Sequence, residues 1–143
     1  MATNYVQSTG IPTDGNGIIL DDFHCSQSWD IGQTGGVNYP HASLIENNLC
    51  YNNGGRGIHI FNSDNATIRN NTCYYNNYIL DQYGHYSADL QVEGAGCSLY
   101  NNIAIQKPSL STRSRAIKIY NQTPPCERNI FAVPLKELLV QII

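Results

Sequence analysis

The amino-acid sequence predicts an all-β solenoid, in which short strands wind into stacked coils, and three observations lead to this prediction. A segment rich in asparagine returns along the chain, strand-like segments lie between its copies, and the composition is poor in helix formers. Charged residues make up 13% of the 143 residues, whereas there are 12 glycines and 10 tyrosines. Such a composition suits short strands joined by turns better than it suits long helices.

The first observation is a repeated segment built on a pair of asparagines. It reads IENNLCYNN in residues 45–53, IRNNTCYYNN in residues 68–77 and, less clearly, LYNNIAI in residues 99–105. The copies recur after roughly two to three dozen residues, which is the period of a solenoid. Asparagine tolerates left-handed backbone angles, and its amide can bond to the asparagines above and below it. We therefore expect each pair to form a corner of the coil.

The second observation is a set of segments that alternate with period two, as a strand with one buried face does. They read GIILDD, GIHIFN, DLQVEG and AIKIYN, at residues 17–22, 57–62, 89–94 and 116–121. The residues predicted to face inward are Ile18, Leu20, Ile58, Ile60, Leu90, Val92, Ile117 and Ile119. The outward residues form two columns, one of Ile19, His59, Gln91 and Lys118 and one of Asp21, Phe61, Glu93 and Tyr120. Because one unit cannot bury its apolar face alone, we expect the units to stack as a parallel β-helix, with strands about 4.8 Å apart.

We expect a single domain, with the coils in residues 1–132 and a tail in residues 133–143 (VPLKELLVQII) that caps or assembles the coils. An antiparallel β-sandwich is the alternative fold, and the repeated corners argue against it. The cysteines are odd in number and fit no close metal pattern, so we expect small buried residues rather than disulfides. They are Cys25, Cys50, Cys73, Cys97 and Cys126.

Charge and hydropathy exclude two classes of partner. The net charge is −3, and no basic field is present to gather phosphates, so we expect no nucleic acid partner. No apolar run approaches the roughly 20 residues that span a bilayer, so we expect no membrane partner. The first residues lack a basic start and an apolar core, so we expect that they do not form a secretory signal. The compartment stays open, and it is extracellular or periplasmic if the full-length form is secreted.

Two adjoining stretches, GRGIHIFNSDN and ATIRNNTCYYNN in residues 55–77, resemble the right-handed parallel β-helix repeats of the pectate-lyase-like superfamily. The resemblance covers residues 14–132 and implies a right-handed helix of about four to five coils. It implies a polysaccharide as the partner and a site on the outward face of one sheet. The reaction stays open, because the superfamily includes lyases, hydrolases, epimerases, esterases and adhesins. So few coils, with no capping helix before them, indicate a fragment or a homo-oligomer that covers its coil ends.

In a lyase, a base removes the proton next to a uronate carboxylate, and a cation or an arginine neutralises that carboxylate. Lys118 is the first candidate for the base and His59 the second, with Arg56 holding the substrate carboxylate. Calcium is the cofactor that this version would use, because three acidic residues offer the hard oxygen ligands that calcium prefers. These candidate ligands are Asp21, Asp22 and Glu93.

In a hydrolase, two carboxylates flank the glycosidic bond. Asp21 and Glu93, if they lie two rungs apart, are separated by about 9 to 10 Å, near the upper end of the range for inverting enzymes. Gln91 and Tyr120 are then candidates for substrate binding on the same face. Trp29 is a further candidate, because its ring can stack on a sugar.

Two readings without catalysis compete with these. In the first, the outward residues form an ordinary solvated strand face, and Lys118 and Glu93 form a cross-strand ion pair. The chain is a truncated solenoid in the second, which binds glycan or associates with itself through its open coil ends.

Overall fold

The computed structural model describes residues 7–8, 11–12, 15–26, 38–77, 88–107, 115–120 and 125–132. Trp29 and the C-terminal segment 133–143 lie outside these residues. Within the described part every regular element is a β-strand, and no helix there is long and apolar enough to cross a membrane.

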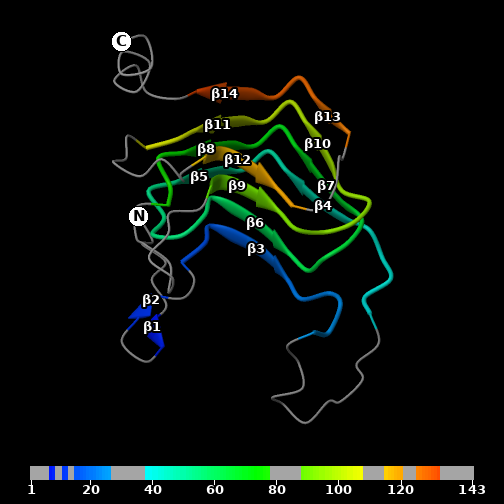
Figure 1. Ribbon diagram of the computed structural model, residues 1–143. Helices are drawn as coiled ribbons and strands as arrows, with labels where there is room; N and C mark the ends of the chain where they lie inside the picture. The colour runs from blue at the N-terminus through cyan, green and yellow to red at the C-terminus, as the bar shows by residue number, and fades with distance from the viewer. Residues whose placement is uncertain are drawn as a thin grey trace.

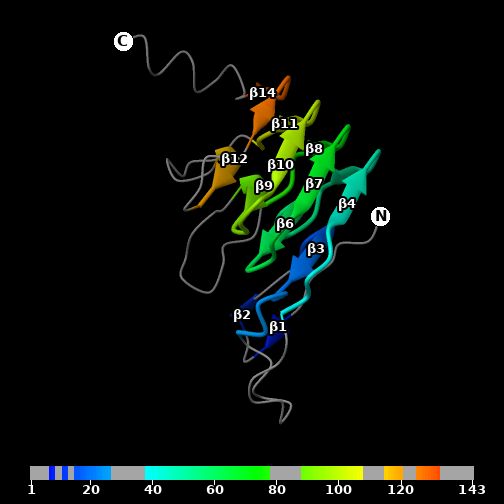
Figure 2. The same cartoon turned by 90° about the vertical axis from the view of Figure 1, so that its right-hand side faces the viewer.

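The described strands form three parallel sheets, and successive coils stack along one axis (Figure 1; Figure 2). The first sheet contains β3 (Ile18–Asp21), β6 (Ile58–Phe61), β9 (Ala88–Val92) and β12 (Arg115–Ile119). The second sheet contains β4 (Ser43–Glu46), β7 (Ala66–Arg69), β10 (Ser98–Tyr100) and β13 (Cys126–Glu127). The third sheet contains β5 (Leu49–Tyr51), β8 (Thr72–Tyr74), β11 (Ile103–Ile105) and β14 (Ile130–Ala132).

Each coil contributes one strand to each sheet, so the described residues make four coils. A short antiparallel pair, β1 (Gln7–Ser8) and β2 (Ile11–Pro12), precedes them. The predicted parallel β-helix is confirmed, and its corners lie where the asparagine pairs were found.

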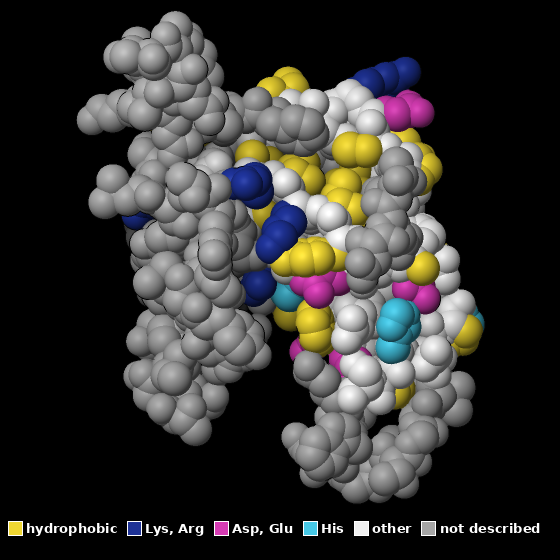
Figure 3. Space-filling model, in the orientation of Figure 1, with side chains coloured by type: hydrophobic (Ala, Val, Ile, Leu, Met, Phe, Trp, Pro, Cys, Tyr) yellow, Lys and Arg dark blue, Asp and Glu magenta, His cyan; other side chains and the backbone are white. Residues whose placement is uncertain are grey.

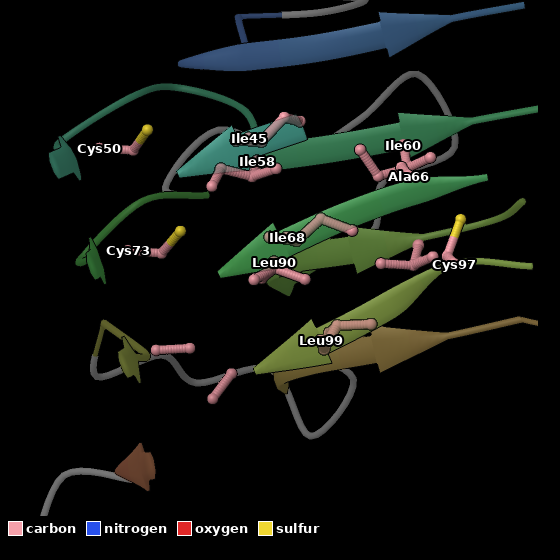
Figure 4. Packing of buried hydrophobic residues seen from close by; sticks show 13 residues of the cluster. Ile45, Cys50, Ile58, Ile60, Ala66, Ile68, Cys73, Leu90, Cys97 and Leu99 are labelled. Atoms are coloured by element: carbon pink, nitrogen blue, oxygen red, sulfur yellow. The ribbon is translucent and has the colours of Figure 1, made fainter. Parts of the chain in front are cut away.

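The core consists of the inward residues that the alternation predicts. In the first sheet Ile18, Ile58, Leu90 and Ile117 stack in register, and so do Leu20, Ile60, Val92 and Ile119. From the second and third sheets, two further columns point into the same interior, Ile45–Ile68–Leu99 and Cys50–Cys73 (Figure 4), and Ala104 continues the second column in register. Residues of the two middle coils are fully enclosed, as Ile58 and Leu90 are at 0% exposure. Each such aliphatic side chain contributes about 1.5–3 kcal/mol by leaving water.

The two asparagines of each pair have different roles. The first of each pair turns the chain, with φ of 58° at Asn47, 55° at Asn70 and 53° at Asn101. Arg128 takes the same position in the fourth coil with φ 54°. Asparagine adopts this left-handed region more readily than most residues, because its short polar side chain tolerates the close backbone contacts.

The second asparagine of each pair points inward and joins a ladder that runs along the axis. Asn48 donates from its backbone nitrogen and from Nδ2 to Oδ1 of Asn71, at 3.1 and 3.0 Å. Asn71 donates in the same way to Asn102, and Asn102 donates to Asn129. The second hydrogen of Nδ2 is also used, as Asn71 donates it to the carbonyl of Ile45. The predicted stacking of asparagines is therefore confirmed.

A second ladder lies at the next corner, after the third sheet. Asn53 donates to Oδ1 of Asn76, and Asn76 donates to Oδ1 of Asp89, from the backbone nitrogen and Nδ2 in each case. The residues that precede these asparagines, Asn52 and Tyr75, have φ of 52°. The ladder therefore repeats the arrangement of the first one and ends on a carboxyl group.

The cysteines are all free thiols, as the sequence predicts. Cys50, Cys73 and Cys97 are buried, and the first two are register partners inside the coil. The prediction of burial is wrong for Cys25 and Cys126. Cys25 lies half-buried in the turn after β3, and Cys126 lies exposed on the last described coil.

We predict that Asn71→Ala destabilises the fold by about 3 kcal/mol, because it removes the acceptor of two Asn48 hydrogen bonds, the donor to the Ile45 carbonyl and one of the two bonds to Asn102 Oδ1. Asn70→Gly changes the free energy of unfolding by less than about 1 kcal/mol, because glycine adopts its positive φ without strain. Urea unfolding of both variants measures the difference. Similar losses in the two neighbouring variants would contradict the separate roles of the two asparagines.

Candidate functional site

The outward residues of the first sheet line up as predicted. Ile19 is the register partner of His59, His59 of Gln91, and Gln91 of Lys118. Asp21 lies beside Phe61, and Glu93 follows β9 with its backbone nitrogen bonded to the carbonyl of Ile60. Basic, acidic and histidine side chains gather over the middle of this face (Figure 3). The face therefore brings together residues that are far apart in the sequence.

Two residues of the outward column are not solvated. His59 is 4% exposed and Gln91 is 1% exposed, although both point away from the core. The expectation of an ordinary solvated strand face is therefore wrong at these two rungs. Burying a polar side chain is unfavourable unless it has hydrogen-bond partners.

The buried polar side chains meet at Glu93. His59 Nε2 lies 3.1 Å from Oε1 of Glu93, and Gln91 donates from Nε2 to the same oxygen. The His59 ring also lies against Phe61 of the same strand, with 5.6 Å between the ring centroids. β6 and β9 thus hold one carboxylate in a defined position, through one group from each strand.

Glu93 is kept ionised by its neighbours. Burial alone would raise the pKa of its carboxyl, but the hydrogen bonds from His59 and Gln91, with the charges of His59 and Arg56, lower it. The Glu93 side chain keeps 21% of its surface exposed, so it can still meet a ligand. Glu93 is therefore suited to accept a proton or to bind a donor, and not to donate a proton at neutral pH.

Cations from the two neighbouring coils lie on either side of the Glu93 coil. Arg56 precedes β6 in the coil before, and Lys118 lies on β12 in the coil after. The Lys118 ammonium lies over the Tyr120 ring, 4.3 Å from its centroid. A cross-strand ion pair between Lys118 and Glu93 was expected, and none is found between these two described residues.

The two other acidic candidates belong to the first coil. Asp21 is exposed on β3, two coils before Glu93. Asp22 stabilises the turn after β3, where its Oδ1 accepts a hydrogen bond from the Ser26 backbone nitrogen at 2.7 Å and one from the Ser26 hydroxyl. Among the described residues, no group of three or more His, Cys, Asp or Glu side chains is placed to hold a metal ion. Trp29 lies outside the described residues.

Sequence reasoning missed Asp89, the first polar residue of β9. Asp89 is 1% exposed; its Oδ1 accepts two bonds from Asn76, and its Oδ2 has no partner in the described part. Burial raises its pKa to about 7, although the Asn76 bonds act in the opposite direction. The sequence did contain a signal for this role. The second asparagine pair of IENNLCYNN, Asn52-Asn53, predicts a second ladder, and that ladder must end on a polar residue such as Asp89.

Fold and outer face together define a parallel β-helix with a polar cluster on one sheet. The family model for the right-handed beta helix region matches residues 3–131, and the chain belongs to this family. No curated protein and no solved structure was found to match the chain. The match accounts for the coils and identifies no substrate or reaction.

We predict opposite effects of pH for two carboxyls of this segment. Asp89 has a raised pKa when folded, so the unfolded chain loses its proton first and stability falls as the pH rises from about 4 to about 7. Asp89→Asn should therefore stabilise the protein at pH 8, by on the order of a few kcal/mol. The advantage should vanish below about pH 4, where both states of the natural chain are protonated. Thermal unfolding as a function of pH measures it.

Glu93→Gln is the contrasting variant. The lowered pKa of Glu93 stabilises the fold above the unfolded value of 4.5, and this contribution is lost as the pH falls through the folded value. The variant should be less stable at pH 7 by about 1 kcal/mol or less, because the group is partly solvated. The same sign of change for both variants at pH 8 would contradict these assignments.

Proposed function

We propose that the chain binds a polysaccharide that carries carboxylate groups, on the outer face of the first sheet across β6, β9 and β12. One observation carries the proposal, namely that a half-buried carboxylate, Glu93, is held by His59 and Gln91 under the influence of the Arg56 charge, with Lys118 beside Gln91 on the following coil. A strand face that meets only solvent has no need of such a network. Perturbed, hydrogen-bonded ionisable groups of this kind concentrate at functional sites.

The chemistry of the face favours a long acidic glycan over other ligands. Arg56 presents a planar fork of donors that matches a carboxylate, and Lys118 adds a second positive charge. Glu93 can accept hydrogen bonds from sugar hydroxyls, and Tyr120 offers an aromatic surface beside Lys118. Successive rungs repeat about every 4.8 Å, so a chain-like ligand can cross several of them.

Elimination suits these residues better than hydrolysis if the bound chain is also cleaved. A hydrolase needs a protonated carboxylic acid that reaches the glycosidic bond. Glu93 stays ionised, and Asp89 is buried and bonded to Asn76, so neither carboxyl can fill that role. In an elimination, Lys118 takes the proton next to the uronate carboxylate while Arg56 neutralises that carboxylate, whereas His59 is buried and bonded to Glu93 and serves to position it. The C–H electron pair becomes the new double bond, the bond from carbon to the glycosidic oxygen breaks, and that oxygen takes a proton from water, so an unsaturated uronate and a new sugar hydroxyl remain.

We predict binding to uronate-rich polysaccharides, weaker binding to neutral ones, and loss of affinity with rising salt. Lys118→Ala and Arg56→Ala should each weaken binding about tenfold, because each removes a charge-assisted contact. Isothermal titration calorimetry measures this. Arg69→Ala is the matched control, since Arg69 pairs with Glu46 on the second sheet at 2.7 Å and should leave the affinity unchanged.

Mixtures of the protein with the same polysaccharides also test for cleavage, because the unsaturated product absorbs ultraviolet light. A chelator arm tests whether a divalent cation such as calcium is required, for which Asp21, Asp22 and Glu93 were the candidate ligands. Absence of binding to every acidic polysaccharide, or equal losses in the Arg69 control, would refute the proposed function.

A further inference from the structure

We infer that this chain forms linear assemblies in which the last coil of one copy stacks on the first coil of the next. The edge formed by β13, Arg128–Asn129 and β14 would then pair with the edge formed by β4, Asn47–Asn48 and β5 of the second copy. The partner is thus another copy of this chain, and the contact continues the stacking that already joins the coils.

The first asparagine ladder has a direction, and its two ends are complementary. Every internal step sends two hydrogen bonds from one asparagine to Oδ1 of the asparagine in the next coil. Asn48 therefore begins the ladder with an Oδ1 that accepts no bond from the described residues. Asn129 ends it with a backbone nitrogen for which no described residue supplies such an oxygen. An Asn48 placed one rung beyond Asn129 supplies the missing acceptor.

The core is incompletely covered in the first sheet at both ends of the described coils, and in the second sheet at the last coil. Ile18 and Leu20 in the first coil are only partly buried, as are Ile117 and Ile119 in the last. In the second sheet the inward column runs from Ile68 and Leu99 at 0% exposure to Cys126, which is exposed. Stacking a second copy would bury these groups, and Ile45 of the second copy, which is 6% exposed in a single copy, would lie over Cys126. Removing this apolar surface from water favours the contact.

One pair of residues opposes the stacking and provides its sharpest test. Glu46, Arg69, Tyr100 and Glu127 occupy one outward column of the second sheet. A second copy would place its Glu46 beside Glu127, and like charges directly across neighbouring strands are unfavourable. An opposite charge on the adjacent rung is favourable in this column, because Arg69 forms an ion pair with Glu46 at 2.7 Å. Glu127→Arg would reproduce that pair across the junction.

Sedimentation velocity over a wide range of protein concentration, with reductant because the Cys126 thiol is exposed, tests this inference. The mean size should grow steadily with concentration and not stop at a dimer, because head-to-tail contacts do not close. Glu127→Arg should strengthen the association about fivefold. Cys126→Arg should weaken it about tenfold or more, because the charge would be buried at the junction yet is exposed in a single copy.

Tyr74→Arg is the matched control, because it adds a cation at an exposed position on β8, an interior strand of the third sheet that belongs to neither proposed edge. It should leave the association unchanged, and circular dichroism confirms that each variant is folded. A natural chain that stays monomeric, or a size that stops at a dimer, would overturn the inference. So would dissociation by Tyr74→Arg, or a Glu127→Arg variant that does not associate more strongly.

Discussion

The structure depends on the buried asparagine amides that join one coil to the next. Asn71 accepts two hydrogen bonds at Oδ1 and donates two from Nδ2, so all the polar capacity of its side chain is used. A leucine could fill the space but would leave the neighbouring amides and the Ile45 carbonyl without partners, and an aspartate would lack the donors. Because a shift by one residue would break every step of the ladder, the amides specify the register of all three sheets.

The outer face inherits its geometry from this register. Fixed rungs bring His59, Gln91 and Glu93 together from two strands that are separated by a long stretch of sequence. The resulting polar network lies on the outside of the sheet but is largely shielded from water, which is why the carboxylate of Glu93 is well positioned. Stability and the candidate site therefore depend on the same stacking, and a change that loosens one coil should disturb both.

Much of this architecture could be predicted from the sequence, because period-two alternation and the asparagine pairs report directly on local backbone geometry. The inward columns, the outward column from Ile19 to Lys118 and the free cysteines are all confirmed. The burial of His59 and Gln91 could not be predicted, because burial depends on what lies against a face and not on the strand pattern. Arg128 was missed as a corner residue, since its left-handed conformation is imposed by the stacked coils and not by its own preference.

Exchange of the side-chain amide hydrogens, followed by nuclear magnetic resonance, tests the central claim most directly. The Nδ2 hydrogens of Asn71, Asn76 and Asn102, which are buried and hydrogen-bonded in the ladders, should exchange slowly with solvent. Those of Asn47, Asn70 and Asn101, which turn the chain and are exposed, should exchange rapidly. Equally rapid exchange in both groups would contradict the account, because it would mean that the ladder amides do not hold the coils together.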